Sequence, residues 1–514
     1  MRRRDVLAGG LAISGASLVG ARAPALIGAE SARPQMPYGP MSGDVLPDRA
    51  MIWGAADRPA RMVVEWSRDA DFRKVQRRLG PLANAGNGFT AKLDLIGLPP
   101  GGDIHYRIAF QDPDDARLVS PWSEAQLRLP DLQPRSVRFT FSGDEAGQGF
   151  GINPDLGGYR LYEAMRQTRP DFFIHLGDQI YADNPLKDEV TLADGNTWRN
   201  LVTPAKARIA ESLDDFRGNF AYNLLDRNKR AFLAEVPILA QWDDHEVRNN
   251  WFPDKAVQSG PSMRELAAHA RQAMVEFNPM RLPGGAIGVE RSFAMGPLLE
   301  VFLLDARSYR GGNAEAASPK PEAGLYGARQ IAWLKQGLAR SRAVWKVIGC
   351  EMPLSLTVKD LMPDVPPGGI EAMANGLSGA PGGREAQLAD LLSFIRAQNI
   401  ANTVWLSADV HFPAAIHYHP DRAAFSDFLP FWEIVAGPIN AGTFPLSYNP
   451  LDPTFGPEIV YVGVREPLAD ISPRAGLQFF GLGEIDPQSH ALTLSIRDIA
   501  GRVQWSRVLE AQRR

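Results

Sequence analysis

The sequence has almost no cysteine, since Cys350 is the only one among its 514 residues. A single cysteine cannot form an internal disulfide bond, so the stability of the fold cannot depend on disulfides. Cys350 ends an apolar run at residues 344–350. This position favours a small buried side chain over a reactive thiol.

Long basic runs and long apolar runs are also missing. Lys and Arg number 55 against 59 Asp and Glu, which gives a net charge of −4. Without concentrated positive charge, we expect no nucleic-acid binding. After the first residues no apolar stretch is long enough to cross a bilayer, so we expect no integral membrane segment in the mature protein. An apolar content of 45% is that of a globular protein.

Residues 1–33 are expected to be an export signal. Arg2, Arg3 and Arg4 precede a short, Gly/Ala-rich apolar stretch at residues 8–20, and residues 21–23 read Ala-Arg-Ala, as a cleavage site would. Paired arginines in this setting resemble a twin-arginine signal. A membrane anchor is the alternative, but the apolar stretch is short for one. We therefore predict a periplasmic or secreted protein that meets the twin-arginine export machinery.

Residues 36–132 predict a small antiparallel β-sandwich domain. Short β-type runs are separated by turn residues, and no helical period intervenes. These runs lie at residues 49–53, 61–66, 89–95 and 104–110. The turn at residues 95–101 resembles that of fibronectin-type modules, and the Pro-flanked residues 129–134 are expected to be a linker.

Residues 136–514 alternate apolar runs with helical stretches, which is typical of a layered α/β domain. A helix is expected at residues 203–223, with Thr203 as N-cap and Pro204 in its first turn. Four β-type runs near the C-terminus, from residue 432 to residue 509, predict a second sheet packed on the first. Residues 363–383 and 437–458 are irregular and rich in Gly or Pro, and such long segments often form lids or binding loops.

Four strands of this domain are each followed by a polar segment. The strands are expected at residues 137–142, 171–176, 236–241 and 402–407. Side chains at strand ends of an α/β domain meet in one site. The acidic members are Asp144, Asp178, Asp244 and Asp409. Four carboxylates together are strongly repulsive unless a cation joins them, so the sequence predicts a metal site.

Two further residues favour a transition metal over a magnesium site made of oxygens alone. Tyr181 stands three residues after Asp178, and His411 stands two residues after Asp409. Imidazole suits zinc, copper, iron or nickel, whereas carboxylate and water suit magnesium and calcium.

The order of these segments resembles the alkaline phosphatase D family of the calcineurin-like metallophosphatases. Residues 175–181 read H-x-G-D-x-I-Y, residues 242–250 read W-D-D-H-E-x-x-N-N, and residues 407–411 read S-x-D-x-H. The resemblance implies a four-layer α/β/β/α sandwich preceded by the fibronectin-like β-sandwich. It also implies an exported, metal-dependent phosphoric ester hydrolase that attacks phosphate monoesters, diesters or both with a metal-bound hydroxide.

The resemblance assigns roles residue by residue. One metal would be held by Asp144, Tyr181 and His411, with Asp178 bridging to a second metal held by Asp244 and Asp409. His245 would donate a proton to the leaving group, and Asn249, Asn250 and Arg307 would contact the substrate. For Asn249 and Asn250, holding the loop is an alternative, and for Arg307 a salt bridge to Asp305 is one.

The family implies an Fe³⁺ and Ca²⁺ pair. Some members place a cysteine ligand near the position of Asp144, and this chain has none there, so zinc or manganese stays an alternative. Two other functions are also open. One is a phospholipid-type diesterase. The other is an exported calcium-binding adhesion module, against which Tyr181 and His411 argue, because calcium prefers oxygen ligands and rarely takes imidazole.

Overall fold

The computed structural model describes residues 32–318, 320, 324–361 and 368–512. Residues 1–31 of the predicted export signal therefore lie outside the described residues, as does part of the irregular segment at 363–383. No helix of the described part is long and apolar enough to span a membrane.

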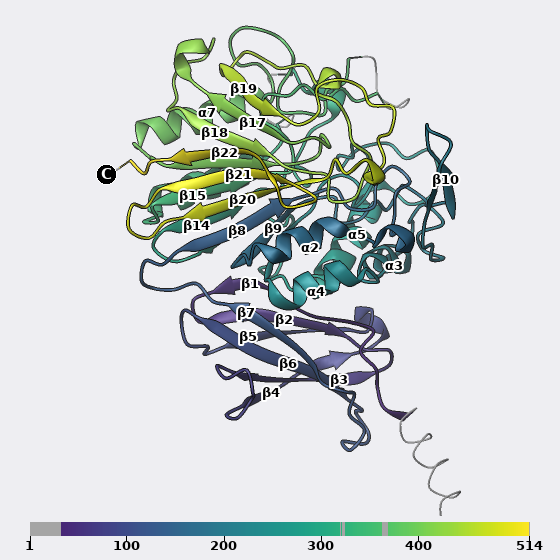
Figure 1. The fold of residues 1–514 in the computed structure, drawn as a ribbon. Coiled ribbons are helices and arrows are strands. Elements are labelled where there is room, and N and C mark those ends of the chain that lie inside the picture. The colour runs from purple at the N-terminus through teal and green to yellow at the C-terminus, as the bar shows by residue number, and fades with distance from the viewer. Residues whose placement is uncertain (1–31, 319, 321–323, 362–367, 513–514) are drawn as a thin grey trace, which may run out of the picture.

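Two large β-sheets form the centre of the molecule (Figure 1). The first has nine strands in the order β22-β21-β20-β8-β9-β12-β1-β2-β5, and the second has seven in the order β13-β14-β15-β16-β18-β17-β19. Strands β8, β9 and β12 are parallel neighbours in the first sheet, and β14, β15, β16 and β18 are parallel neighbours in the second. Parallel neighbours place their carboxyl ends at one edge of each sheet.

The strands of the first sheet have these bounds: β1 Tyr38–Leu46, β2 Arg49–Ala55, β5 Thr90–Ile96, β8 Val137–Ser142, β9 Phe172–Leu176, β12 Ile238–Gln241, β20 Phe479–Ile485, β21 Leu492–Asp498 and β22 Val503–Leu509. Those of the second are β13 Arg291–Ala294, β14 Leu299–Leu303, β15 Trp345–Gly349, β16 Thr403–Ser407, β17 Ala414–Tyr418, β18 Phe431–Val435 and β19 Pro457–Val462. A two-stranded hairpin joins β10 Glu189–Thr191 to β11 Thr197–Arg199.

Alternate residues of the buried strands pack into different layers, because successive side chains of a strand point to opposite faces. Ile174 and Leu176 of β9 pack between the two sheets, against residues such as Val347 and Leu406 of the second sheet. Phe173 of the same strand packs on the outer side, in the cluster that contains the helices of the first sheet. Apolar residues on both faces of these strands require a covering layer on each side.

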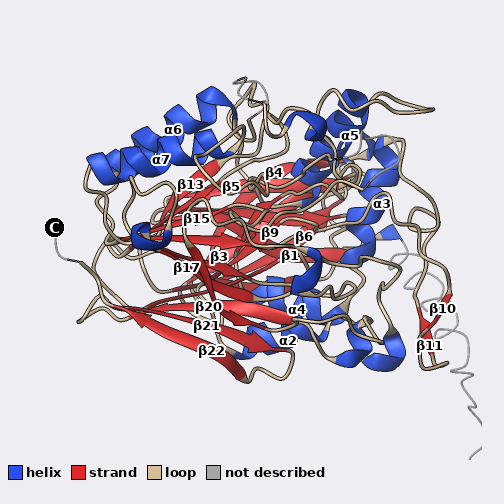
Figure 2. Cartoon of the chain, turned by 90° about the horizontal axis from the view of Figure 1, so that it is seen from above, coloured by secondary structure: helices blue, strands red, loops and turns tan. Residues whose placement is uncertain are grey.

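Helices supply those outer layers, as Figure 2 shows from above. Helices α2 Arg160–Gln167, α3 Leu213–Asn223, α4 Arg227–Glu235 and α5 Met263–Phe277 pack on the first sheet. Helices α6 Gly327–Arg340 and α7 Glu385–Ala397 pack on the second. Short 3₁₀ helices lie at Ala85–Asn87, Pro154–Leu156, Asn313–Glu315, Pro420–Arg422, Leu446–Tyr448 and Pro473–Ala475. The order helix, sheet, sheet, helix confirms the predicted four-layer α/β/β/α sandwich.

Two predictions about single elements are wrong. The helix expected from residue 203 begins at Leu213, because the Ser212 side chain accepts from the Asp215 backbone N–H and Asp215 caps Ser212 in return. The C-terminal strands β20, β21 and β22 do not belong to the second sheet. They extend the first, where β20 pairs antiparallel with β8.

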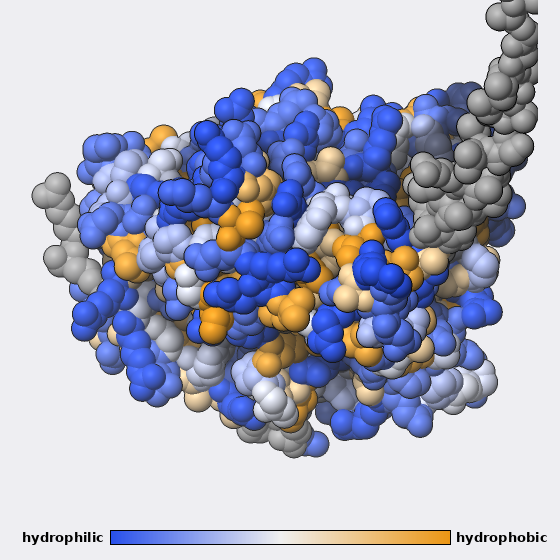
Figure 3. All heavy atoms as spheres, turned by 90° about the horizontal axis from the view of Figure 1, so that it is seen from below, coloured by the Kyte–Doolittle hydropathy of each residue, from blue (hydrophilic) through white to orange (hydrophobic). Residues whose placement is uncertain are grey.

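The N-terminal strands form a β-sandwich at one end of the molecule. Its second sheet has the order β4-β3-β6-β7, with β3 Ala60–Ser67, β4 Gln76–Ala83, β6 Asp103–Gln111 and β7 Ser123–Arg128. Its other sheet, β1-β2-β5, is part of the nine-stranded sheet, since Gly43 of β1 pairs with Ile238 of β12. A Cβ at Gly43 would lie 2.4 Å from the Ile238 carbonyl oxygen, so this junction requires glycine. Seen from below, this end is mostly hydrophilic with scattered apolar patches (Figure 3).

Candidate metal centre

The polar segments after β8, β9, β12 and β16 meet in one cavity. Strands β8, β9 and β12 are neighbours in the first sheet, and β16 belongs to the sheet packed against it. The cavity has a volume of about 520 Å³, and its lining includes Asp178, Asp244, His245, Asp409 and His411. Side chains separated by more than 200 residues of sequence are thus brought to one place.

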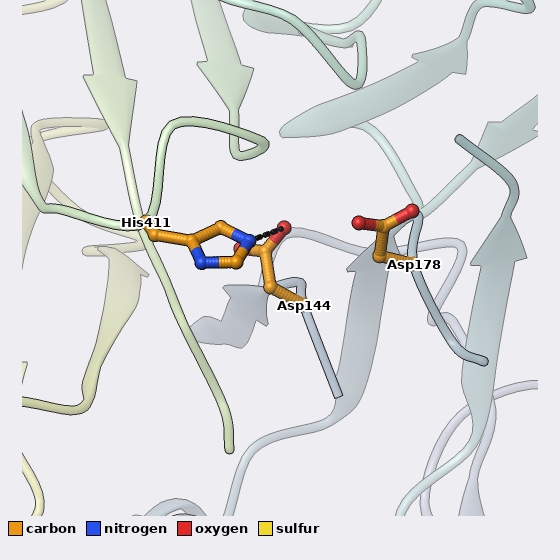
Figure 4. A group of neighbouring side chains, drawn as sticks. All are labelled: Asp144, Asp178 and His411. Atoms are coloured by element: carbon orange, nitrogen blue, oxygen red, sulfur yellow. Dashed lines mark ion pairs between the residues drawn. The ribbon is translucent and has the colours of Figure 1, made fainter. Parts of the chain in front are cut away.

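Asp144, Asp178 and His411 form the first cluster (Figure 4). One potential ligand atom of each lies within 4.8 Å of those of the other two, and all three residues are buried. His411 Nε2 lies 3.6 Å from Asp144 Oδ1. The three side chains come from three separate loops and could hold one metal ion together.

Tyr181 completes this cluster. Its hydroxyl lies 2.8 Å from His411 Nε2, and the side chain is fully buried. His411 Nδ1 lies 2.5 Å from the Gly442 carbonyl oxygen, which can only accept, so Nδ1 carries the hydrogen and Nε2 carries the lone pair. Burial lowers the pKa of His411 to about 4. The imidazole is therefore held neutral, with the basic nitrogen directed at the cluster, as metal-ligating histidines are.

Two further clusters lie beside the first. Asp178, Asp244 and His245 form one, and Asp243, Asp244 and Asp409 form the other. Asp178 and Asp244 thus each take part in two clusters. Asp243 belongs to the W-D-D-H-E motif but was not among the predicted metal ligands. Its Oδ1 accepts from Arg307 Nε at 2.7 Å.

Several carboxylate oxygens in these clusters lack a hydrogen-bond partner among the described residues. They are both oxygens of Asp144, Oδ1 of Asp244 and Oδ2 of Asp243, and all are buried. Burial, followed by the charges of neighbouring carboxylates, raises the pKa of Asp144, Asp178 and Asp409 well above the ordinary value. A cation would satisfy these oxygens and remove the repulsion. The donor set, which combines carboxylates with an imidazole and a phenol, therefore fits a metal centre.

The backbone at the predicted ligands adopts the left-handed region that non-glycine residues rarely occupy. The φ angle is 67° at Asp144, 51° at Asp178, 68° at Asp409 and 58° at His411. Such conformations persist only where the surroundings hold them, and they concentrate at functional sites. Hydrogen bonds between loops supply that support, since the Asp144 N–H donates to the Gly177 carbonyl and the Glu145 N–H donates to the Asp178 carbonyl.

His245 belongs to the second cluster and also contacts a residue that the sequence did not single out. Its Nδ1 lies 2.6 Å from Asp183 Oδ1, and its ring stacks on Tyr181 with centroids 4.2 Å apart. Burial lowers the pKa of His245, but Asp183 and Asp244 outweigh it and raise the pKa to about 9. Asp183 stands five residues after Asp178, yet sequence alone gave no sign that its carboxylate reaches His245.

The three residues predicted to contact substrate have different environments. Asn249 lines the cavity, and its side chain has no hydrogen-bond partner within the described ranges. Asn250 also lines it, but its side-chain amide donates to Asp360 Oδ1 at 2.8 Å, and its backbone N–H donates to Asp244 Oδ2. Asn250 thus holds the loop and a predicted ligand.

Arg307 is fully buried and is not part of the cavity lining. Its guanidinium pairs with Asp243 and Glu371, and not with the Asp305 side chain expected as the alternative partner. Only the Arg307 backbone N–H contacts Asp305. Arg307 is therefore placed to stabilise the acidic cluster through Asp243, and not to contact a ligand in the cavity.

A loop after β18, residues 437–444, packs against Asp144 and His411. The Ile439 and Asn440 N–H groups donate to the Asp144 carbonyl, and Gly442 accepts from His411. A Cβ at Gly437 would lie 2.3 Å from Asp144 Oδ2. Phe444 stacks on His411 with centroids 4.9 Å apart. The sequence marked this segment as a long irregular one, and its contacts identify it as a wall of the site.

Comparison with known proteins gives consistent matches. Residues 141–496 match the PhoD-like phosphatase family, and residues 21–127 match the PhoD-like phosphatase, N-terminal domain. Alkaline phosphatase D of Bacillus subtilis (strain 168) is 28% identical over 439 residues, which cover 79% of this chain and 69% of that protein.

Two solved structures share the fold. A structure of PhoD aligns with a TM-score of 0.67 at 23% identity and covers 92% of this chain and 88% of that one. Purple acid phosphatase PPD1 from yellow lupin (Lupinus luteus) seeds aligns with a TM-score of 0.59 at 12% identity, over 92% of this chain and 74% of that one.

Proposed function

Since the chain belongs to the PhoD-like phosphatase family and is a phosphoric ester hydrolase, we propose that the cavity beside Asp144, Asp178 and His411 is its active site. The proposed reaction is metal-dependent hydrolysis of phosphate monoesters, diesters or both. The observation that carries this proposal is the set of buried carboxylate oxygens without hydrogen-bond partners in the described part of the chain. These oxygens lie beside an imidazole whose free nitrogen faces them.

We assign two metal ions to the clusters. Asp144, Tyr181 and His411 would hold one, Asp244 and Asp409 would hold the other, and Asp178 would bridge them. The family resemblance suggests Fe³⁺ and Ca²⁺, with zinc or manganese as the alternative. Bound metal ions would neutralise charge on the phosphoryl oxygens and activate a water molecule for attack on phosphorus.

His245 is proposed as the proton donor to the leaving oxygen. With a pKa raised to about 9, the imidazole is protonated at neutral pH. Asp183 accepts the hydrogen on Nδ1, which leaves the Nε2 hydrogen for transfer. When the imidazolium transfers its proton, the leaving group departs as a neutral alcohol and not as an alkoxide.

Asn249 is proposed to donate its side-chain amide to the phosphoryl group, because it lines the cavity without another partner in the described residues. Asn250 and Arg307 are proposed as positioning residues. Asn250 holds Asp244, and Arg307 holds Asp243. Within the loop after β12, neighbouring asparagines would thus divide substrate contact from ligand support.

We further propose that the protein is exported through the twin-arginine route and acts in the periplasm or outside the cell. The support is the sequence pattern at Arg2, Arg3 and Arg4. Replacing Arg3 and Arg4 by Lys should leave the precursor in the cytoplasm. Normal export of that variant would contradict the route and leave the assignment of the active site untouched.

The test of the proposed function combines metal analysis with hydrolysis assays. The purified protein should contain two metal ions per chain, and Asp178→Asn should lose metal and activity together. Asp71→Asn, an exposed site on the N-terminal sandwich, is the control and should keep both. Full activity of Asp178→Asn with metal still bound would contradict the assignment.

The choice between ester classes needs a substrate pair. Rates on 4-nitrophenyl phosphate and on bis(4-nitrophenyl) phosphate, measured with one metal-loaded sample, decide between a monoesterase and a diesterase. A protein that cleaves only the diester would favour the phospholipid-type diesterase.

A further inference from the structure

Apart from His245, which is assigned to the leaving group, the charged side chains that line the active-site cavity are acidic with one exception. Five carboxylates line it, from Asp178, Asp183, Asp244, Glu371 and Asp409. Lys359 is the only Lys or Arg among the lining residues of the described chain. An anionic part of a substrate that lies beyond the metal ions and His245 can therefore meet one basic side chain, that of Lys359.

The Lys359 ammonium is unpaired in the part of the chain that the structure describes. No ion pair or hydrogen bond engages it, so no carboxylate oxygen of the described residues lies within 4.0 Å of the amine. The side chain is exposed. Its ammonium therefore forms no ion pair with the described carboxylates that would hold the metals.

The backbone that carries Lys359 is fixed. Lys359 pairs with Ile370 in a β-bridge. On either side of it, the Val358 carbonyl accepts from the Glu371 N–H at 2.8 Å, and the Asp360 N–H donates to the Gly369 carbonyl at 2.9 Å. Only the flexible side chain remains free to reach a ligand.

This segment is also joined to the metal clusters. Asp360 accepts from the Asn250 amide at 2.8 Å, and the Asn250 backbone N–H donates to Asp244 Oδ2. Two hydrogen bonds thus connect the residue next to Lys359 with a predicted metal ligand. The backbone position of Lys359 relative to the proposed metal ligands is therefore held by the fold, and the length of its side chain limits how far the ammonium can reach.

Asn449 adds a neutral donor to the same cavity. It lines the cavity although its relative exposure is only 8%, and its side-chain amide has no hydrogen-bond partner within residues 32–318, 320, 324–361 and 368–512. Its amide is open to the cavity and is therefore available to donate to a ligand. An ammonium and an amide are donors that suit a phosphate group.

We propose that Lys359 and Asn449 form a subsite for a second phosphate group of the substrate, separate from the phosphoryl group that is hydrolysed. This inference rests on the proposed function, because it presupposes that ester hydrolysis takes place in the same cavity. The predicted preferred substrates are phosphate esters whose leaving alcohol carries a further phosphate group.

The experiment compares two esters with one chain length. The probes are propane-1,3-diol bisphosphate and 3-hydroxypropyl phosphate. The measured quantity is kcat/KM for the bisphosphate divided by kcat/KM for the monophosphate. In Lys359→Met this ratio should fall about three- to ten-fold, mainly through a higher KM for the bisphosphate, as for loss of a partly exposed charge pair. Lys359→Glu should lower it further. Asn449→Ala should lower it in the same sense.

Lys74→Met is the matched control, because Lys74 is exposed on the N-terminal sandwich. The kcat/KM ratio of this variant should equal that of the wild type. Raised ionic strength should reduce the wild-type ratio towards that of Lys359→Met. A ratio unchanged in both Lys359 variants would overturn the subsite while the proposed function stands. If the metal-loaded wild type hydrolyses neither ester and neither nitrophenyl substrate, the proposed function fails and the subsite falls with it.

Discussion

Asp183 Oδ1 lies 2.6 Å from His245 Nδ1, and the other oxygen of Asp183 accepts the Asn249 N–H at 2.6 Å. One carboxylate therefore orients the proposed proton donor and fixes the backbone of the proposed phosphoryl contact. Burial lowers the pKa of His245, but the charge and hydrogen bond of Asp183, together with the charges of Asp244 and Asp243, raise it to about 9.

Replacing Asp183 by Asn should remove the charge that orients His245 and lower kcat by about 100-fold, within the usual range for general acid catalysis. The loss should be larger for an alkyl phosphate than for a nitrophenyl ester, since nitrophenolate leaves without a proton. Bound metal, measured by elemental analysis, should stay unchanged. Asp188→Asn, at an exposed site of the same segment, is the control. An equal loss on both esters would show that Asp183 acts only through structure.

Replacing Gly437 by Ala should displace the Asp144 carboxylate, because the added Cβ would lie 2.3 Å from Asp144 Oδ2. The expected result is a loss of one metal per chain and of most activity, with the far-UV circular dichroism unchanged. Gly97→Ala is the matched control: its φ is +76°, and no atom lies within 4 Å of the added Cβ. That variant should cost about 1 kcal/mol of stability and keep its metal. Full metal content in Gly437→Ala would refute the role given to this glycine.

Replacing Tyr181 by Phe removes the hydroxyl that lies 2.8 Å from His411 Nε2 and leaves the ring that stacks on His245. If the first metal is Fe³⁺, the wild-type protein should show a visible charge-transfer band from tyrosinate, and the variant should lack it. Tyr309→Phe, which loses a hydrogen bond to Glu290 outside the site, should keep the band. A band of equal strength in iron-loaded Tyr181→Phe would exclude Tyr181 as the ligand.

Glu433 gives a prediction for stability against pH. Burial raises its pKa to about 7, although Ser407, Tyr418 and the Leu354 N–H all donate to it. The folded protein thus favours the protonated form, whereas an unfolded Glu ionises near 4.5. Stability from this group is present below pH 4.5 and is lost as pH rises to about 7, by a total on the order of 3 kcal/mol.

Glu433→Gln should abolish that pH dependence. The melting temperature of the variant, relative to wild type, should be higher at pH 8 than at pH 5. Glu458→Gln, at an exposed position, should show no such trend. A difference that does not change with pH would mean that Glu433 is ionised in the folded protein.

Local patterns in the sequence were sufficient to predict most strands and most helices of the catalytic region. The expected strand at residues 171–176 is β9, and that at 402–407 is β16, because each is a short apolar run bounded by turns. The start of α3 was predicted wrongly because Thr203 and Pro204 are residue types that favour a helix N-terminus. In the structure, Ser212 and Asp215 form the N-terminal cap. The placement of β20 beside β8 depends on pairing over more than 300 residues, which no local period encodes.

The sequence by itself determined that carboxylates accumulate at strand ends and therefore call for a cation. It supplied Asp144, Asp178, Asp244, Asp409, Tyr181 and His411. Only the tertiary structure decided which groups meet. It turned Arg307 towards Asp243, joined Asp183 to His245 and placed Lys359 alone on an acidic wall. The reason is that these contacts arise from loops whose left-handed backbone and mutual hydrogen bonds form only after the two sheets have packed.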